Sequence, residues 1–158
     1  LVTDISYKGE YGIAVYRVET GTKNIVAGSD QVKFQGWADK DAYGFRWTNA
    51  KEAFVSCYLN ENDYTMTIYN GHEIPFDQIS AKEINVKVYL NENYIQTISY
   101  TADNSGMVQD VKLPSEWILK GINTIKFECD TWSPSEYGSA DNSNYGFSIS
   151  SIEFTEQQ

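Results

Sequence analysis

Residues 84–100, INVKVYLNENYIQTISY, decide the fold of this chain. Apolar side chains occupy every second position of the first half, at Ile84, Val86, Val88 and Leu90. A side-chain period of two is typical of a β-strand that buries one face and exposes the other. The polar residues 91–93 interrupt the pattern, and residues 94–100 resume it. The stretch therefore predicts a β-hairpin that lies on a hydrophobic core.

Similar short runs occur on both sides of this hairpin, and turn-forming residues separate them. The runs span residues 13–19, 24–27, 32–37, 43–47, 52–59, 64–69, 107–113, 122–129 and 145–154. Only residues 114–120, PSEWILK, suit a helical turn, because proline fits a first helical position and Gly121 fits the stop. About nine or ten short strands with regular turn signals predict an all-β fold, which we expect to be an antiparallel jelly-roll β-sandwich.

The last run changes face part of the way along. Its apolar residues occupy odd positions at Phe147 and Ile149 and even positions at Ile152 and Phe154. Since alternate residues of a strand point to opposite faces, one extra residue is needed to keep both pairs in the core. We therefore predict a β-bulge near residues 150 and 151.

The 158 residues are enough for one complete hydrophobic core, so we expect a single β-sandwich domain over residues 1–158. Because the chain begins at Leu1 rather than at methionine, we expect it to be a fragment of a larger protein. The 12 basic and 22 acidic residues give a net charge of −10, which argues against binding to nucleic acid or to anionic membranes. No apolar run approaches the ~20 residues of a membrane helix, so we expect no membrane insertion by this segment.

Two cysteines, Cys57 and Cys129, lie within predicted strands. Their neighbours two positions away are apolar, which places both thiols on apolar faces. We favour free buried thiols over a disulfide between facing strands, although the sequence leaves that disulfide open. Neither cysteine has the spacing of a metal ligand.

Three stretches of the sequence resemble a known family. Residues 84–129 combine a hairpin, a Leu-Pro pair and the motif GINTI before a further strand, and this order resembles the second half of many carbohydrate-binding jelly rolls. Residues 133–154, SPSEYGSADNSNYGFSISSIEF, resemble the end of terminal β-sandwich domains in bacterial membrane and cell-surface proteins that build or handle polysaccharides. The Gly-Trp and Gly-Phe-Arg-Trp segments within residues 36–47 resemble the matching early motif.

This resemblance implies a non-catalytic carbohydrate-binding module. Its partners would be a glycan or polysaccharide and the other domains of its parent protein. The parent would be an extracytoplasmic bacterial protein, which places the module in the extracellular space or at the cell surface. Two alternatives remain open: a structural or interaction domain without its own ligand, and a small glycan hydrolase.

No catalytic residue is predicted. The chain has one histidine, His72, and lacks the G-x-S-x-G motif of a nucleophilic serine. A glycosidase needs only two suitably spaced carboxylates, but nothing in the sequence selects one pair among the 22 acidic residues. We therefore expect a protein that is not an enzyme.

Aromatic residues are the candidates for a glycan site, because the flat ring of a tryptophan or tyrosine can stack on the apolar face of a sugar. Trp37, Tyr43 and Arg46 lie in a stretch rich in glycine and aspartate, where the arginine could bind sugar hydroxyl groups. Core packing is the alternative, and we favour it for the neighbouring Phe45 and Trp47.

A long loop over residues 130–144 supplies the second group of candidates. It contains Trp132 and Tyr137 and leads to Tyr145, among serine, aspartate and asparagine residues. Loops of about fifteen residues without hydrophobic periodicity are usually functional or mobile, and rigid scaffolds often hold binding residues on loops. The alternative is that Trp132 closes the end of the sandwich as a plug.

The same loop carries the acidic residues Asp130, Glu136 and Asp141. Carboxylates are ligands that Ca²⁺ prefers, and modules of the resembled family often hold a structural Ca²⁺. These three residues could hold such an ion, although solvated acidic loops are the commoner explanation of the pattern. We expect that no cofactor is required for binding.

Overall fold

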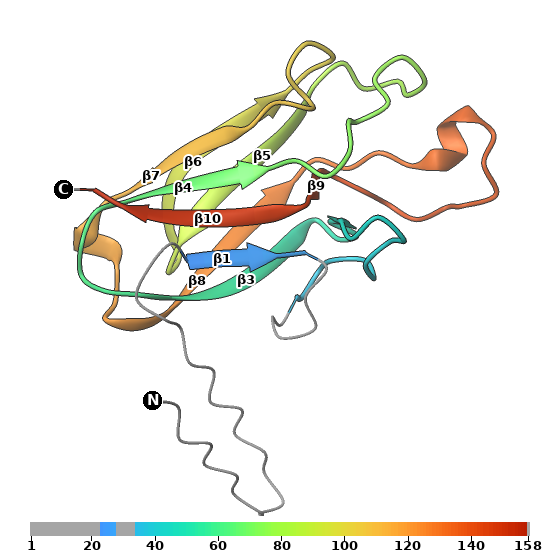
Figure 1. Ribbon diagram of the computed structural model, residues 1–158. Coiled ribbons are helices and arrows are strands. Elements are labelled where there is room, and N and C mark those ends of the chain that lie inside the picture. The colour runs from blue at the N-terminus through green and yellow to red at the C-terminus, as the bar shows by residue number, and fades with distance from the viewer. Residues whose placement is uncertain (1–22, 28–33, 158) are drawn as a thin grey trace, which may run out of the picture.

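A computed structural model describes residues 23–27 and 34–157, which form ten β-strands and two short 3₁₀-helices (Figure 1). The strands are β1 (Lys23–Val26), β2 (Arg46–Trp47), β3 (Glu52–Leu59), β4 (Tyr64–Tyr69), β5 (Ile84–Leu90), β6 (Asn93–Tyr100), β7 (Gln109–Leu113), β8 (Gly121–Cys129), β9 (Ser148–Ile149) and β10 (Ser151–Glu156). The 3₁₀-helices are η1 (Ser115–Trp117) and η2 (Pro134–Tyr137). The expected strand over residues 13–19 lies outside the described residues.

Two four-stranded sheets form the layers of the molecule. One sheet has the strand order β1-β10-β4-β7 and the other the order β3-β8-β5-β6, and all pairs are antiparallel. Strands β2 and β9 form a separate two-stranded pair. Strands from opposite parts of the sequence, such as β1 and β10, are neighbours (Figure 1). The all-β antiparallel jelly-roll sandwich predicted from the sequence is confirmed.

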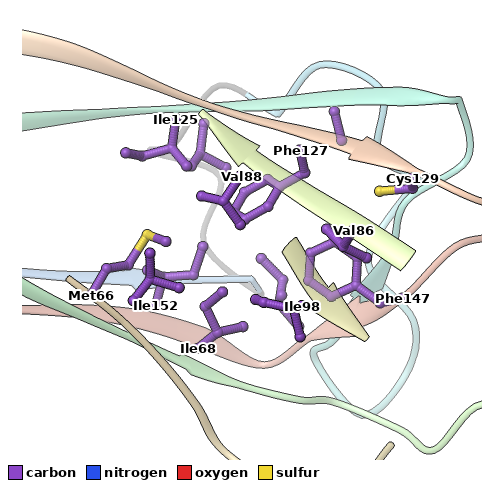
Figure 2. Packing of buried hydrophobic residues seen from close by; sticks show 14 of the residues in the cluster. Met66, Ile68, Val86, Val88, Ile98, Ile125, Phe127, Cys129, Phe147 and Ile152 are labelled. Carbon is purple, nitrogen blue, oxygen red and sulfur yellow. The ribbon is translucent and has the colours of Figure 1, made fainter. Parts of the chain in front are cut away.

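The core lies between the two sheets, and strand alternation builds it. In β5 the side chains of Ile84, Val86, Val88 and Leu90 are buried, while that of Lys87 is exposed. Figure 2 shows apolar side chains of both sheets meeting in the core, among them Val86, Val88, Ile125 and Phe127 from one sheet and Met66, Ile68 and Ile152 from the other. Burial of this apolar area is the main stabilising contribution to the fold.

The predicted change of face in the last run is present as a break at Ser150. Residues before it form β9, which pairs with β2, and residues after it form β10, which pairs with β4 and β1. The backbone amide of Ser150 donates to the carbonyl of Tyr69 at 2.8 Å. The extra residue lets Ile149 and Ile152 both face the core.

Two expected strands differ from the structure. The described part of the run 32–37 makes only isolated bridges, of Gln35 with Phe54 and of Trp37 with Thr48. Gly36 has φ +77°, and a Cβ there would lie 2.1 Å from the Glu52 carbonyl oxygen, so the backbone turns where a strand was expected. Of the run 43–47, only Arg46–Trp47 is a strand. The residues before β2 form a turn, because the Asp41 carboxylate accepts hydrogen bonds from the backbone amides of Tyr43 and Phe45.

The segment before β8 confirms the predicted helical turn as a 3₁₀-turn. Pro114 precedes η1, and Gly121 begins β8 with φ +117°, a conformation that suits glycine. Asn123 of the GINTI motif is fully buried, and its amide group bonds the backbone of Leu119 and Gly121. The motif therefore fixes the start of β8.

Cys57 and Cys129 are both buried, and neither forms a disulfide within the described residues. Cys57 lies opposite Asn123 in the β3–β8 pair. Asn123 precedes Cys129 on β8 by six residues, so the two cysteines are separated by about 20 Å along the strand direction. The preference for free thiols over a disulfide is thus confirmed. None of the helices in the described part of the chain has the length and apolar character needed to cross a bilayer.

Candidate functional site

The sandwich has two unlike ends. At the loop end, the connections 38–45, 70–83 and 130–147 meet, and at the hairpin end, the shorter connections 60–63, 91–92 and 114–120 close the sheets (Figure 1). Most aromatic candidates lie at the loop end. Six rings there form an aromatic cluster, which consists of Phe45, Trp47, His72, Trp132, Tyr137 and Tyr145.

Trp47 stands at the centre of this cluster. Its ring meets Trp132 edge-on at 5.3 Å between centroids and lies 6.0 Å from Tyr145 and 6.3 Å from His72. The pairing of β2 with β9 fixes its backbone, with Trp47 opposite Ser148. Its side chain is only partly buried. A partly exposed indole on a fixed backbone is suited to contact a ligand with little loss of entropy.

Local hydrogen bonds order the loop 130–147. Trp132 and Tyr145 exchange two backbone hydrogen bonds of 2.8 Å each across its base. Ser133 and Glu136 form a capping box at the start of η2. The second carboxylate oxygen of Glu136 accepts from the hydroxyl and the backbone amide of Ser80, at 2.6 Å and 2.9 Å. These bonds lower the pKa of Glu136 and tie the loop to the connection 70–83.

Asp141 holds the far side of the same loop. Its carboxylate accepts from the backbone amide of Ser143 at 2.8 Å and from the phenol of Tyr145 at 3.0 Å. These hydrogen bonds lower the pKa of Asp141. The phenol bond also sets the orientation of the Tyr145 ring against Trp47.

The structure brings three of the predicted glycan-binding residues together. Trp132 contacts Tyr137 at 6.4 Å and Tyr145 at 5.8 Å. Trp132 is only 5% exposed, however, and its indole N–H donates to the Gly146 carbonyl at 2.9 Å. Its ring supports the cluster from below, as the alternative of a plug describes. Tyr137 is 41% exposed and Tyr145 is partly buried, so these two rings reach the surface.

The other three predicted residues lie apart from the cluster. Trp37 is 7% exposed, packs edge-on against Phe127 and Phe147, and donates its indole N–H to the Phe54 carbonyl at 3.1 Å. Trp37 is therefore packed in the core, as the alternative of core packing describes.

Arg46 and Tyr43 also differ from the expectation of a shared site with Trp37. The guanidinium of Arg46 donates to the carbonyls of Ala27 and Ala38 and lies 4.6 Å above the Phe34 ring, so it is engaged within the fold. Tyr43 is 89% exposed at the tip of the turn that Asp41 closes. In the described part of the chain, no ring contact joins Tyr43 to the cluster.

Three members of the cluster were not predicted as site residues. The sequence favours core packing for Phe45 and Trp47, and it gives the single histidine, His72, no predicted role. Phe45 and Trp47 are partly buried, and His72 is exposed between them, with its ring 5.8 Å from that of Phe45. The Asn-Gly pair before His72 is the one sequence feature that belongs to this contact. Glycine is needed at position 71 because a Cβ there would lie 2.3 Å from the Phe45 Cβ.

The three acidic candidates for a calcium site do not converge. Asp130 accepts from the backbone amide of Asn85 at 3.0 Å, while Glu136 and Asp141 bind their own neighbours as described above. Within residues 23–27 and 34–157, no three His, Cys, Asp or Glu side chains gather as metal ligands. The donor set that the sequence suggested therefore does not fit one Ca²⁺ ion.

Comparison with known proteins finds likeness in structure only. No protein-family model and no curated protein sequence matches the chain. A family 35 carbohydrate-binding module from an environmental isolate superposes with a TM-score of 0.52 at 19% identity, over 85% of this chain and 93% of that module. The CBM36-1 domain of a multidomain xylanase from the hindgut metagenome of Trinervitermes trinervoides gives a TM-score of 0.50 at 10% identity, over 87% of this chain and 99% of that domain.

A third solved structure shows the same fold inside a longer enzyme. It is the GH26-CBM35 β-(1,4)-mannanase of Podospora anserina, with a TM-score of 0.51 at 14% identity over 89% of this chain and 28% of that one. At such identities the likeness concerns the fold. The resemblance to carbohydrate-binding jelly rolls seen in the sequence is confirmed at that level.

Proposed function

We propose that this β-sandwich is a non-catalytic carbohydrate-binding module that binds a glycan at its loop end. The observation that carries the proposal is the aromatic cluster, in which Trp47, Tyr137 and Tyr145 are exposed in part over the buried Trp132. Rings that are held from below and open above can stack on the apolar face of a sugar. The fold of the neighbours named above supports the same ligand class.

The polar groups around these rings suit sugar hydroxyls. The phenol of Tyr145 bonds Asp141, and the ring of His72 bonds the Glu73 carbonyl at 3.0 Å, so each has a fixed direction. The number of exposed rings is small, and binding energy depends mainly on a few aromatic anchors. The proposed module therefore binds with modest affinity and needs no cofactor.

The carboxylates of the loop end support binding of a glycan without its hydrolysis. A glycosidase needs one carboxylic acid that stays protonated, with its pKa raised, beside a second carboxylate. At the loop end, hydrogen bonds lower the pKa of both Glu136 and Asp141. Both groups are therefore ionised near neutral pH and fixed in local bonds.

The proposed setting is an extracytoplasmic bacterial protein, with the module in the extracellular space or at the cell surface. The resemblance of residues 133–154 to terminal domains of polysaccharide-handling proteins supports this setting. The part of the mannanase that matches this protein is 28% of the mannanase chain, so that module is joined to further parts of a longer enzyme. A similar arrangement would make the other domains of a parent protein the partners of this module.

The test is affinity electrophoresis of the protein in gels that contain xylan, mannan, β-glucan or galactan, with and without Ca²⁺. Binding to one of them is followed by titration of the intrinsic tryptophan fluorescence. We expect the Trp47→Ala variant to bind about tenfold more weakly, because it loses the central ring. Calcium should leave the affinity unchanged.

Trp117→Ala is the matched control, because Trp117 is also partly buried but lies at the hairpin end. Its affinity should equal that of the wild type. Retention of folded protein in each variant is checked by circular dichroism. Absence of retardation in every gel, or equal losses in both variants, contradicts the proposal.

A structural or interaction domain without its own ligand is the second candidate. The burial of Trp37 and Trp132 favours it, since two of the four tryptophans serve the core. Under this alternative the folded protein binds none of the four polysaccharides. The gel experiment therefore separates the two candidates.

A further inference from the structure

The outward face of the sheet β3-β8-β5-β6 carries features that the loop end does not use. One cross-strand row of this face consists of Phe54, Lys126, Tyr89 and Tyr94, in register across all four strands. Tyr94 is 50% exposed, and its ring meets that of Tyr89 edge-on at 5.6 Å. The ammonium of Lys126 lies 4.3 Å above the Tyr89 ring. The two tyrosines are therefore braced against each other, with Tyr94 open to solvent.

A polar groove adjoins this row on the side of the loop end. It has a volume of about 580 Å³, and its lining includes Asn85, Lys87, Glu128, Asp130 and Thr131. Along β5, Asn85, Lys87 and Tyr89 point to the same face. Asn85 and Lys87 line the groove, and Tyr89 follows them on that face, outside the lining. From Asn85 to Tyr89 the strand covers about 13 Å, which is longer than one pyranose ring.

We infer that the groove and the tyrosine pair form a second glycan-binding site, the sheet site, which takes an uncharged oligosaccharide lying along β5. The ring of Tyr94 stacks on one sugar unit, and the donors and acceptors of Asn85, Lys87 and Thr131 bind the hydroxyls of the next. The sheet site shares its ligand class with the loop-end proposal, but it shares none of the cluster's residues.

The charged side chains of the sheet site favour an uncharged oligosaccharide as its ligand. Lys87 is bonded to Glu128 at 2.7 Å, and Lys126 lies 3.7 Å from both Glu52 and Glu92. Both lysines beside the tyrosines are thus engaged by carboxylates. Lys51 also lines the groove, on the side of the loop end. Next to the rings, the carboxylates of Glu52, Glu92 and Glu128 would repel a glycan with carboxylate or sulfate groups and oppose its binding.

The experiment maps the amide signals of the ¹⁵N-labelled protein during titration with xylohexaose, mannohexaose, cellohexaose and an oligogalacturonate of equal length. We expect a neutral hexasaccharide to shift amides of residues 85–89 and 93–97, and the oligogalacturonate to shift them far less. The Tyr94→Ala variant should bind the neutral hexasaccharide about tenfold more weakly, as determined from the shifts of these amides. Tyr58→Ala, an exposed tyrosine on the same face of β3, should leave it unchanged.

The loop end is read in the same spectra through the amides of residues 45–48 and 132–145. Shifts there without shifts on β5 and β6 overturn the sheet site and leave the loop-end proposal standing. Shifts on β5 and β6 alone support the sheet site and contradict the loop end. Equal effects of Tyr94→Ala and Tyr58→Ala, or stronger binding of the oligogalacturonate than of the neutral chains at the sheet, also overturn the inference. If Tyr94→Ala perturbs folding, Asn85→Ala serves as the second variant, with the same expected loss.

Discussion

Polar side chains form hydrogen bonds at both ends of the sandwich, but the bonds serve different purposes. At the hairpin end, the buried side chain of Asn123 takes part in four hydrogen bonds, one of which comes from the Asn91 amide. At the loop end, polar side chains are exposed and bond residues close by, as Asp141 does with Ser143 and Tyr145. The first arrangement closes a core, and the second shapes a surface.

The difference underlies our proposal that a ligand binds at the loop end. A buried polar group must have all its partners, which leaves none for a ligand and makes any loss severe. The loop end instead keeps one ring, Trp132, in the core and exposes others above it. Stability there depends on the buried ring, and binding is expected to depend on the exposed ones.

Replacement of Trp132 by alanine should give the largest effect. The change removes a ring that is 5% exposed, breaks its bond to the Gly146 carbonyl and leaves a cavity. We expect the free energy of unfolding to fall by about 4 kcal/mol, as measured by urea denaturation. Tyr137→Ala, at the exposed side of the same cluster, should change it by less than about 1 kcal/mol. Similar losses in the two variants would refute this division of roles.

Asn123→Ala tests the hairpin end. The substitution removes the side-chain partner of the Leu119 amide and of the Leu119 and Gly121 carbonyls, and one of the acceptors of the Asn91 amide, beside the core. We expect a loss of about 3 kcal/mol in the free energy of unfolding, with glycan binding at 25 °C unchanged. A loss below about 1 kcal/mol would show that water replaces the amide and that this end is less closed than described.

Alkaline pH should weaken the base of the loop end. Burial raises the pKa of Cys129 from 9.0 to about 12, although a bond to Thr48 opposes the shift. The unfolded chain therefore loses this proton first, and the contribution of the thiol, complete below pH 9, declines as pH rises toward 12. From pH 8 to pH 10 the free energy of unfolding should fall by about 1 kcal/mol because of this group. Cys129→Ala should remove that part of the slope, and an unchanged slope would contradict the assignment.

Much of the fold could be predicted because its signals are local. The runs 52–59, 64–69 and 84–90 begin and end where β3, β4 and β5 do, since a period of two specifies both the strand and its buried face. The break at Ser150 was also predictable, because the apolar positions change parity there. The capping box of Ser133 and Glu136 could have been read from the letters SPSE.

The candidate site could be predicted only in part because burial of an aromatic ring depends on distant segments. Trp37 is covered by Phe127 and Phe147, and nothing near it in the sequence indicates this. Trp47 was assigned to the core from its alternation, yet β2 is two residues long and its partner β9 lies at the other end of the sequence. The acidic residues were visible, but whether they converge depends on loop geometry.

The smallest predicted effect returns to the hairpin end and separates backbone strain from side-chain bonding within one turn. Asn91 and Glu92 connect β5 to β6 with φ of 47° and 70°, as in the two-residue turns that favour Asn-Gly. Glu92→Gly removes strain and only an exposed charge pair with Lys126, so we expect a gain of about 0.5 kcal/mol in the free energy of unfolding. Asn91→Gly relaxes the same backbone but removes bonds to Trp117 and Asn123, so it should destabilise. Differential scanning calorimetry of the two variants gives opposite shifts in Tm if side-chain bonding holds this end closed, and parallel gains if the backbone alone does.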